Sequence, residues 1–263
     1  WLKWLAPNFA YIYESSKVYI GWRRRLAMTW GSWTIIGAAW LILLNPGVGQ
    51  AVQHLRRSGD PDKKVVLVIG GTGTIGQPLV DKLRDRGDVE VISASRHSSE
   101  VQVDITSPDS ILALGQQFPQ GIDHVVVIGG TPETAPLVGF TPETWTKSIQ
   151  DKLLAVSNLV MMLVEGTPNI LRDGGSITIT TGLASRMPAK PLLGLAVNNA
   201  GLNAFVMDGG INLPRGLRLN AVSPDGVGNL IGEIPADKVA DKFISLIFGD
   251  QSGVVLEAKP GLR

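Results

Sequence analysis

A glycine-rich segment between a strand-like run and a helix-like run constrains the fold of this chain most. Residues 65–69, VVLVI, are continuously aliphatic, as expected of a strand buried on both faces of a parallel sheet. The segment GGTGTIG follows at 70–76, and apolar residues then recur at helical spacing at Leu79, Val80 and Leu83. This order of strand, glycine turn and helix is typical of a turn that binds a dinucleotide, and the alternative is a glycine-rich turn without a ligand.

The glycines of this segment have distinct expected roles. We expect Gly70 to permit the tight turn, Gly73 to let the backbone approach a pyrophosphate, and Gly76 to let helix and strand pack closely. The free N–H groups at the start of the helix would then face the phosphates. The residues assigned to this loop are Gly70, Thr72, Gly73, Thr74, Ile75 and Gly76.

The rest of the chain alternates between strand and helix patterns. After the first strand, strands are expected near 89–94, 101–103, 123–129, 175–181, 217–222 and 254–257, and helices near 77–86, 108–118, 141–165, 191–212 and 235–248. Alternation of this kind implies a parallel sheet with right-handed crossovers. The sequence therefore predicts an α/β fold, a Rossmann-type doubly wound parallel sheet of about seven strands.

The end of the second expected strand indicates which dinucleotide would bind. It reads Ser95-Arg96, where an acidic residue would bind a ribose 2′-hydroxyl and an arginine suits a 2′-phosphate. We therefore expect NADP(H) in preference to NAD. Asp104 and Ile105 would lie near the adenine ring, with a plain loop carboxylate as the alternative for Asp104. Gly129 would line the pocket after the fourth strand.

The composition of the chain changes near residue 60. All but one of the seven tryptophans and all three tyrosines precede residue 41, and residues 26–53 contain no charged side chain. Residues 26–47 would form about 33 Å of helix, enough to span a hydrocarbon core of about 30 Å. The sequence thus predicts an aromatic-rich interfacial segment at 1–25, a transmembrane helix at 26–47, a linker at 48–63 and a globular domain at 64–263.

The hydrophobic segment has other interpretations, namely an interfacial helix, a helix buried against a partner, or a signal peptide, although no small-residue cleavage site follows it. Trp30, Trp33 and Trp40 share one face, which suits a partner helix, a pigment or a lipid, or forms a lipid-facing stripe. Basic residues flank both ends, so the positive-inside rule leaves the orientation open. We expect a single-pass membrane protein with its globular domain on the cytoplasmic side, or on the stromal or matrix side in an organelle.

The composition also excludes several classes of site. With no cysteine in the chain, thiolate catalysis and sulfur-ligated metals are excluded. His54, His97 and His124 are far apart and lack ligand spacing, so we expect each of them at the surface or in a loop and no metal site. The net charge of +1 and the lack of a basic and aromatic strand pattern argue against nucleic acid as a partner.

Residues 64–263 resemble a short-chain dehydrogenase/reductase over their whole length. The resemblance rests on GGTGTIG at 70–76, SASR at 93–96, VDI at 103–105, GGSITITTGLASR at 174–186 and RLNAVSPDG at 218–226. The segment VNNA at 197–200 is similar to the compact members of the family, which carry a VNxA-type helix in place of the tyrosine helix. The resemblance implies a Rossmann fold and a nicotinamide dinucleotide as cofactor.

Four positions that correspond to the family's active-site residues hold other residue types. The catalytic serine corresponds to Thr181, the tyrosine to Leu195, the lysine to Asn199, and the asparagine of the preceding helix to Lys152. In the family the tyrosine exchanges a proton with the substrate oxygen, while the lysine lowers the tyrosine pKa and holds a ribose. Leu195 cannot exchange a proton, although Asn199 could still bind a ribose hydroxyl.

Three alternative functions are compatible with these differences from the family's active-site residues. The first is a non-catalytic, membrane-anchored accessory subunit of a membrane complex, photosynthetic or respiratory, that binds NADP(H) or has lost it. The second is an active NADP-dependent oxidoreductase in which Lys152 or water gives the proton and Thr181 orients a carbonyl. The third is a nucleotide-sensing regulator. The alternative for Lys152 is a structural ion pair with a carboxylate such as Asp151 or Glu165.

Removing residues 1–60 should release the remaining domain into the soluble fraction, because the predicted spanning segment is then absent. The measurement is fractionation of expressing cells followed by alkaline extraction of the membranes. Removing residues 1–22 alone is the control and should leave the protein in the membrane. Retention of the longer truncation in the membrane would show that the anchor has been misplaced.

Overall fold

The computed structural model describes residues 63–97, 100–187, 189–226 and 234–260. The chain divides between residues 50 and 51 into two units, and the described residues all belong to the second. The predicted interfacial segment and transmembrane helix lie outside the described residues, as does the linker except for Lys63. Within the described ranges, no helix combines the length and the apolar character that a membrane span needs.

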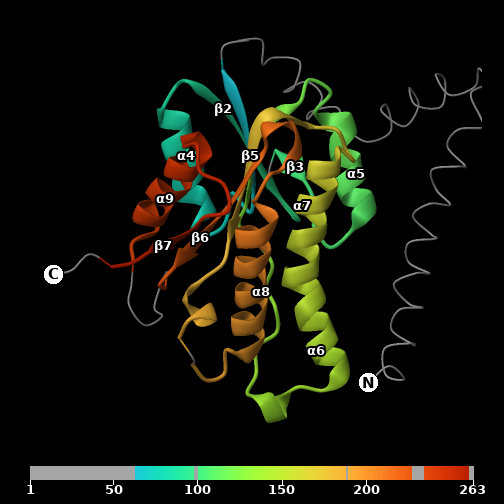
Figure 1. The fold of residues 1–263 in the computed structure, drawn as a ribbon, viewed down its shortest axis with the longest axis vertical. Helices are drawn as coiled ribbons and strands as arrows, with labels where there is room; N and C mark the ends of the chain where they lie inside the picture. The colour runs from blue at the N-terminus through green and yellow to red at the C-terminus, as the bar shows by residue number, and fades with distance from the viewer. Residues whose placement is uncertain (1–62, 98–99, 188, 227–233, 261–263) are drawn as a thin grey trace, which may run out of the picture. The chain divides into compact units, whose positions relative to one another are not determined.

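Seven parallel strands form one sheet in the order β3-β2-β1-β4-β5-β6-β7 (Figure 1). Their bounds are β1 Lys64–Ile69, β2 Val89–Ser95, β3 Val101–Gln102, β4 Ile122–Val127, β5 Leu171–Thr180, β6 Arg218–Pro224 and β7 Val255–Ala258. The chain starts in the middle of the sheet, runs to one edge and then returns past β1 to the other edge. The predicted doubly wound parallel sheet is therefore confirmed, and its order reverses between β1 and β4.

Helices cover both faces of this sheet (Figure 1). Their bounds are α4 Gly76–Asp85, α5 Pro108–Gln117, α6 Pro142–Ile149, α7 Ala155–Glu165, α8 Leu193–Gly209 and α9 Ala236–Phe248. Apolar residues of α4 and α9 pack with one face of the strands, and those of α5, α7 and α8 pack with the other. The core extends to the last residues of the two central strands, Ile69 of β1 and Val127 of β4. Ligands bind beyond this carboxyl edge of the sheet in folds of this class.

The single helix expected at 141–165 is instead interrupted. A π-helical turn, Gln150–Leu154, separates α6 from α7. The backbone N–H of Leu153 donates to Oδ1 of Asn198 on α8 at 2.9 Å, so it leaves the regular helical pattern. A contact with α8 therefore stabilises the π-helical turn. The turn changes the direction in which the side chains around Lys152 point.

His124 is buried, so the expectation of a surface or loop position is wrong for this residue. It lies on β4, its Nδ1 is 2.9 Å from Oγ of Ser176 on β5, and its ring meets Phe248 edge to face. Burial lowers the pKa of His124 to about 4; the nearby Asp123 charge raises it, and those of Arg218 and Lys64 lower it further. His97 is exposed as expected, and His54 lies outside the described residues.

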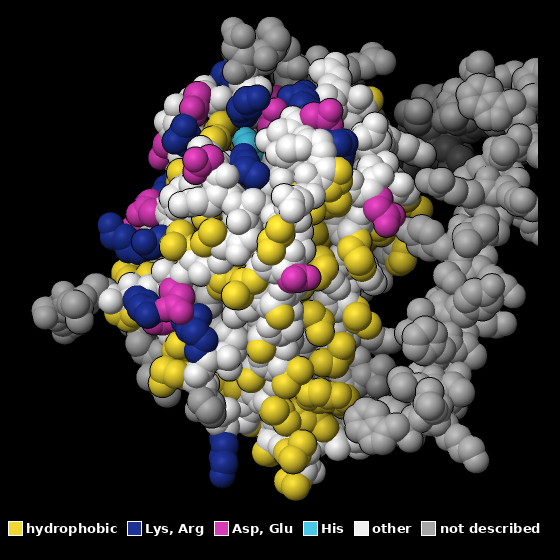
Figure 2. Space-filling model, in the orientation of Figure 1, with side chains coloured by type: hydrophobic (Ala, Val, Ile, Leu, Met, Phe, Trp, Pro, Cys, Tyr) yellow, Lys and Arg dark blue, Asp and Glu magenta, His cyan; other side chains and the backbone are white. Residues whose placement is uncertain are grey.

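Several large apolar side chains are exposed on the described surface. Leu137 and Val138, in a short 3₁₀ turn, are 78% and 94% exposed, and Met207 and Ile211 lie at and just beyond the end of α8. Figure 2 shows apolar side chains gathered at the lower end of the face in view, where Figure 1 shows α6 and α8. Contiguous exposed apolar surface of this kind is typical of contacts with other proteins or membranes.

The buried His124 should make the domain lose stability in mild acid. Because its pKa is lowered, the unfolded chain takes up a proton below about pH 6.5 that the folded chain does not take up until about pH 4. Stability should therefore fall as the pH drops through this window. His124→Asn, which cannot titrate, should be less stable at pH 7 but lose less on acidification. Thermal unfolding of both proteins between pH 7.5 and 4 tests this, and parallel curves would contradict it.

Candidate functional site

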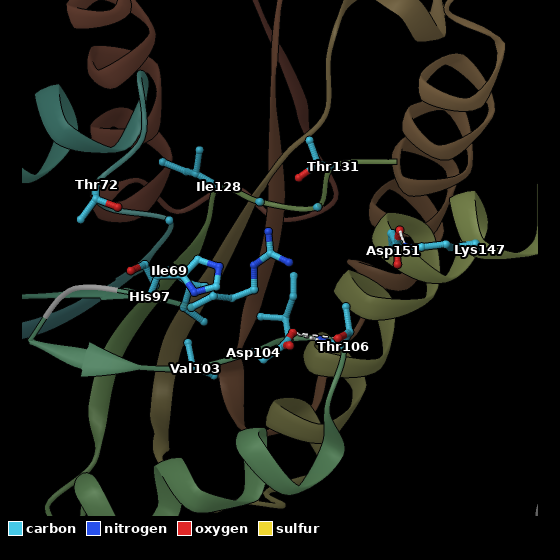
Figure 3. Close-up of a pocket in the computed structure, with 16 residues that line it drawn as sticks. Ile69, Thr72, His97, Val103, Asp104, Thr106, Ile128, Thr131, Lys147 and Asp151 are labelled. Carbon is cyan, nitrogen blue, oxygen red and sulfur yellow. Dashed lines mark hydrogen bonds and ion pairs between the residues drawn. The ribbon is translucent and has the colours of Figure 1, made fainter. Parts of the chain in front are cut away.

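A cavity of about 640 Å³ opens at the carboxyl ends of β1, β2 and β4 (Figure 3). Its volume lies within the range usual for cofactor sites. It is lined by Ile69, Gly70, Thr72, Ser95, Arg96, His97, Val103, Asp104, Ile105, Thr106, Ile128, Gly129, Gly130, Thr131, Lys147 and Asp151. Seven predicted pocket residues are thus brought together there: Gly70, Thr72, Ser95, Arg96, Asp104, Ile105 and Gly129. Gly73, Thr74, Ile75, Gly76 and Asn199 are not among the lining residues.

The backbone at the first βα turn requires glycine at two positions. Gly70 has a φ of +87°, and a Cβ there would lie 1.9 Å from the carbonyl oxygen of Ile128. A Cβ on Gly76 would lie 2.0 Å from the carbonyl oxygen of Gly70. A Cβ on Gly73 meets nothing closer than 3.4 Å, and Gly73 is exposed. Protein packing therefore explains Gly70 and Gly76, whereas Gly73 leaves room beside the cavity that a ligand can use.

Polar residues after β2 and β3 form the outer end of the cavity. Arg96 and His97 are both exposed there, and the carbonyl oxygen of Arg96 accepts from the side chain of Gln102 at 2.8 Å. Asp104 accepts from the backbone N–H and the hydroxyl of Thr106 at 2.9 and 2.8 Å. These two hydrogen bonds lower the pKa of Asp104, so it is ionised and fixed in the loop. An exposed arginine at this end leaves its guanidinium available to an anion.

Lys147 and Asp151 form a wall of the cavity that the sequence patterns did not indicate. They are paired across one turn of helix, and Figure 3 shows them on the opposite side of the cavity from Thr72. The i,i+4 spacing of opposite charges was visible in the sequence, but only the fold brings that helix face to the cavity. His97, Thr106 and Thr131 were also missed, although each lies close to the end of a correctly predicted strand.

Lys152 does not line the cavity but is buried behind two residues that do, Gly129 and Gly130, and we call this buried region the inner end. Its expected ion pair with Asp151 or Glu165 is not formed. Asp151 pairs with Lys147 instead, and Nζ of Lys152 donates to the carbonyl oxygen of Gly129 at 3.2 Å. Burial lowers the pKa of Lys152 to about 8. The π-helical turn explains the difference, because it directs Lys152 inward while Asp151 stays within reach of Lys147.

Thr181 and Asn199 are also buried, and neither of them lines the cavity. Oγ1 of Thr181 and Oδ1 of Asn199 have no hydrogen-bond partner within the described residues. The two residues are neighbours through Gly182, since a Cβ on Gly182 would lie 3.2 Å from Nδ2 of Asn199. Leu195, one turn earlier on α8, is half-buried. Oγ1 of Thr178 and Oδ1 of Asn203 likewise have no hydrogen-bond partner within the described residues.

Arg186 fixes the loop that carries Thr181. Its guanidinium donates to Oγ of Ser223 at 2.6 Å, and it pairs with Asp225 at 2.5 Å and with Glu257 at 3.1 Å. These partners lie at the carboxyl ends of β6 and β7. The loop after β5 is thereby tied to the carboxyl ends of β6 and β7.

Comparisons with known proteins agree with this architecture. The sequence model of the NAD dependent epimerase/dehydratase family matches residues 66–162. The crystal structure of the protein lin1944 from Listeria innocua is 34% identical, with a TM-score of 0.68, over 74% of this chain and 99% of that chain. The chain belongs to the short-chain dehydrogenase/reductase (SDR) and epimerase family. It therefore shares the family's nucleotide-binding fold.

Two further solved structures and one curated protein are also similar to the chain. A small-chain dehydrogenase is 26% identical, with a TM-score of 0.61, over 75% of this chain and 97% of that chain. A small-chain dehydrogenase crystallised with NADPH is 24% identical, with a TM-score of 0.63 and the same coverage, and shows likeness of fold. An uncharacterised short-chain type dehydrogenase/reductase of Sinorhizobium fredii is 26% identical over 180 residues. The chain spans about a third of the length of that curated relative.

Two glycine substitutions should separate packing from ligand contact. Gly76→Ala should lower the free energy of unfolding by several kcal/mol, because its Cβ would overlap backbone atoms of the turn. Gly73→Ala should change stability by less than about 1 kcal/mol but weaken NADPH binding at least tenfold. Chemical denaturation and fluorescence titration measure the two effects. Unchanged NADPH affinity in Gly73→Ala would place the phosphates elsewhere.

Proposed function

We propose that this SDR-family chain binds NADP(H) in the cavity at the carboxyl ends of β1, β2 and β4. The observation that supports the proposal is that the glycine turn and the exposed Arg96 line the same cavity, which has the size of a cofactor site. Ser95 and Arg96 would hold the 2′-phosphate, and Ile105 would contact the adenine. When bound, NADPH would supply a hydride. The chain's own residues bind and orient the nucleotide.

We further propose that the chain is not a conventional dehydrogenase. Leu195 stands where the family has its tyrosine, and no tyrosine follows Tyr19 in the sequence. Leucine cannot exchange a proton, and loss of a positioned general acid costs about 10²–10⁴-fold in rate. A chain with leucine at this position is suited to bind the nucleotide without normal catalytic turnover.

The proposal that the chain has a role in a membrane rests on its sequence. The uncharged, tryptophan-rich segment at 26–47 suits a helix that packs against a partner in a photosynthetic or respiratory membrane complex, or against lipid or pigment. Exposed Leu137 and Val138 give the globular domain apolar surface of its own for such a complex. The chain would then act as an accessory subunit whose nucleotide site serves stability or regulation.

A second candidate function is favoured by Lys152. A lysine with a pKa of about 8 exchanges protons near neutral pH, as a general acid requires. In that case the chain would be an NADP-dependent oxidoreductase, with Lys152 giving the proton and Thr181 orienting a carbonyl oxygen.

The nucleotide preference should depend on Arg96. Arg96→Asp should weaken NADPH binding at least tenfold, because the carboxylate repels a 2′-phosphate. The same carboxylate accepts a hydrogen bond from a 2′-hydroxyl, so the variant should bind NADH at least as tightly as NADPH. Lys238→Asp, an equal charge change at an exposed position of α9, should alter neither. Isothermal titration with both nucleotides measures the effect. A wild-type protein that binds neither nucleotide at millimolar concentration would refute the proposed function.

Catalysis should be absent from the wild type. NADPH oxidation across a panel of aldehydes and ketones should stay at the background rate. Leu195→Tyr with Asn199→Lys, made in a Lys152→Asn background, should gain turnover because it restores the family's residues at those positions. Robust wild-type turnover that Lys152→Ala abolishes would instead establish the second candidate.

A further inference from the structure

We propose that the short 3₁₀ turn between β4 and α6 inserts into the surface of a lipid bilayer. The turn, Leu137–Gly139, carries the two most exposed of the large apolar side chains that the structure describes, and we call residues 136–140 the apolar tip. This inference rests on the membrane role proposed above and names a contact that the globular domain itself would make. The partner of the apolar tip is lipid.

The domain holds the apolar tip at both of its ends. On one side, Oγ of Ser148 donates to the carbonyl oxygen of Glu133 at 2.8 Å, and a Cβ on Gly194 of α8 would lie 2.0 Å from the same oxygen. On the other side, the rings of Phe140 and Trp145 meet edge to face, with their centroids 5.1 Å apart. Such a pair across a helix start fixes the angle at which the chain enters the helix. The scaffold therefore determines the direction in which the tip projects.

The exposed side chains of the apolar tip have no role in the core. Leu137 and Val138 belong to neither buried cluster and do not pack against either of them. Residues 134–142 contain no charged side chain. The N–H of Gly139 donates to the carbonyl oxygen of Pro136 at 2.8 Å, and Pro136 has no N–H, so the turn itself satisfies backbone groups that an apolar medium would leave without partners.

The small size of the apolar tip favours lipid over a protein partner. Stable protein interfaces bury roughly 800 Å² on each partner. A projecting turn with two large apolar side chains cannot supply such an area by itself. Insertion into a bilayer needs less surface once the chain is anchored, because the second contact is then made within one membrane-bound molecule. The predicted transmembrane helix at 26–47 would be that anchor.

The linker limits how far the domain can lie from the membrane. Residues 48–63 span at most about 55 Å when fully extended. A compact domain of about 200 residues is roughly 43 Å across, from its expected radius of gyration. The described chain enters the sheet at Lys64, at the amino edge, whereas the segment that leads into α6 turns beyond the carboxyl edge, at the lower end of Figure 1. The linker is therefore long enough to let the apolar tip reach the bilayer.

Two carboxylates beside the apolar tip indicate the kind of lipid. Glu133 precedes the tip and Glu143 lies in the first turn of α6, and both are exposed. Negative headgroups would repel these carboxylates. We therefore expect the tip to insert into a zwitterionic bilayer through its apolar side chains, without any gain from anionic lipid.

The test uses the full chain reconstituted into phosphatidylcholine vesicles. Because the chain has no cysteine, Val138→Cys provides a single thiol for a fluorescent label. Brominated acyl chains should at least halve the emission of this label, since bromine quenches on contact. The same label on Asp85→Cys, at the end of α4 and thus at the amino edge, is the control and should keep its emission. Adding phosphatidylserine should not increase the quenching.

A second substitution tests whether the apolar side chains drive the contact. Leu137→Ser, added to labelled Val138→Cys, should weaken the quenching because it removes half of the exposed apolar pair. Met207→Ser, at an exposed apolar residue near the end of α8, is the matched control and should leave the quenching unchanged. Equal quenching in both double variants would overturn the inference.

The outcomes separate this inference from the proposed membrane role. Quenching at Asp85 but not at Val138 would show that the linker alone orients the domain, and would overturn the inference. A Val138 label that is shielded from water but not quenched would place a protein, such as a second copy, on the tip and overturn it as well. A wild-type chain that does not float with the vesicles would refute the membrane role too. Should Val138→Cys not fold, as judged by thermal unfolding, Leu137→Cys carries the label, and unquenched emission there rejects the inference.

Discussion

The structure depends on two positions after β1 where no side chain can be accommodated. The carbonyl oxygens of Ile128 and Gly70 occupy the space that a Cβ on Gly70 and on Gly76 would need. The first contact brings the ends of β1 and β4 together, and the second seats α4 against the turn. The cavity lies beside this close approach, at the point where the strand order reverses. The site is therefore built on backbone packing before any functional side chain is added.

The interruption of the long helix is the second determinant of the site. Asn198, on α8, withdraws one N–H from the helix opposite and so changes the register of the residues around Lys152. The π-helical turn buries it against Gly129 and Gly130, where desolvation brings its pKa to about 8. A local irregularity thus changes the chemistry available at the inner end.

Hydrophobic patterns predicted the fold because the strands are buried on both faces and their aliphatic runs are continuous. Strand β5 begins earlier than expected, at Leu171, because Leu171 pairs with Ile122 of β4. The polar segment 172–175 that follows lies within a register shift before pairing resumes at Ser176. The outer half of the cavity was likewise predictable, because its residues directly follow strands. The buried region around Lys152 could not be predicted from the sequence. Asn198 acts on Leu153 across 45 positions of sequence, and no local pattern carries that contact.

The buried His124 illustrates the same limit. A histidine within an otherwise aliphatic strand is compatible with either burial or exposure, and its partners Ser176 and Phe248 come from distant segments. Likewise, the charges of Lys147 and Asp151 were visible as a helical pair, but the cavity they face exists only once the sheet has formed. Contacts between elements that are remote in the sequence therefore determine where these side chains lie.

The close approach of Gly130 to Lys152 also couples two segments that lie far apart in the sequence. Gly130 has a φ of +83°, and a Cβ there would lie 2.8 Å from the side chain of Lys152. Any other residue at position 130 would strain the backbone and require a different position of the lysine side chain. Substitutions in the loop after β4 and in the π-helical turn should therefore depend on one another.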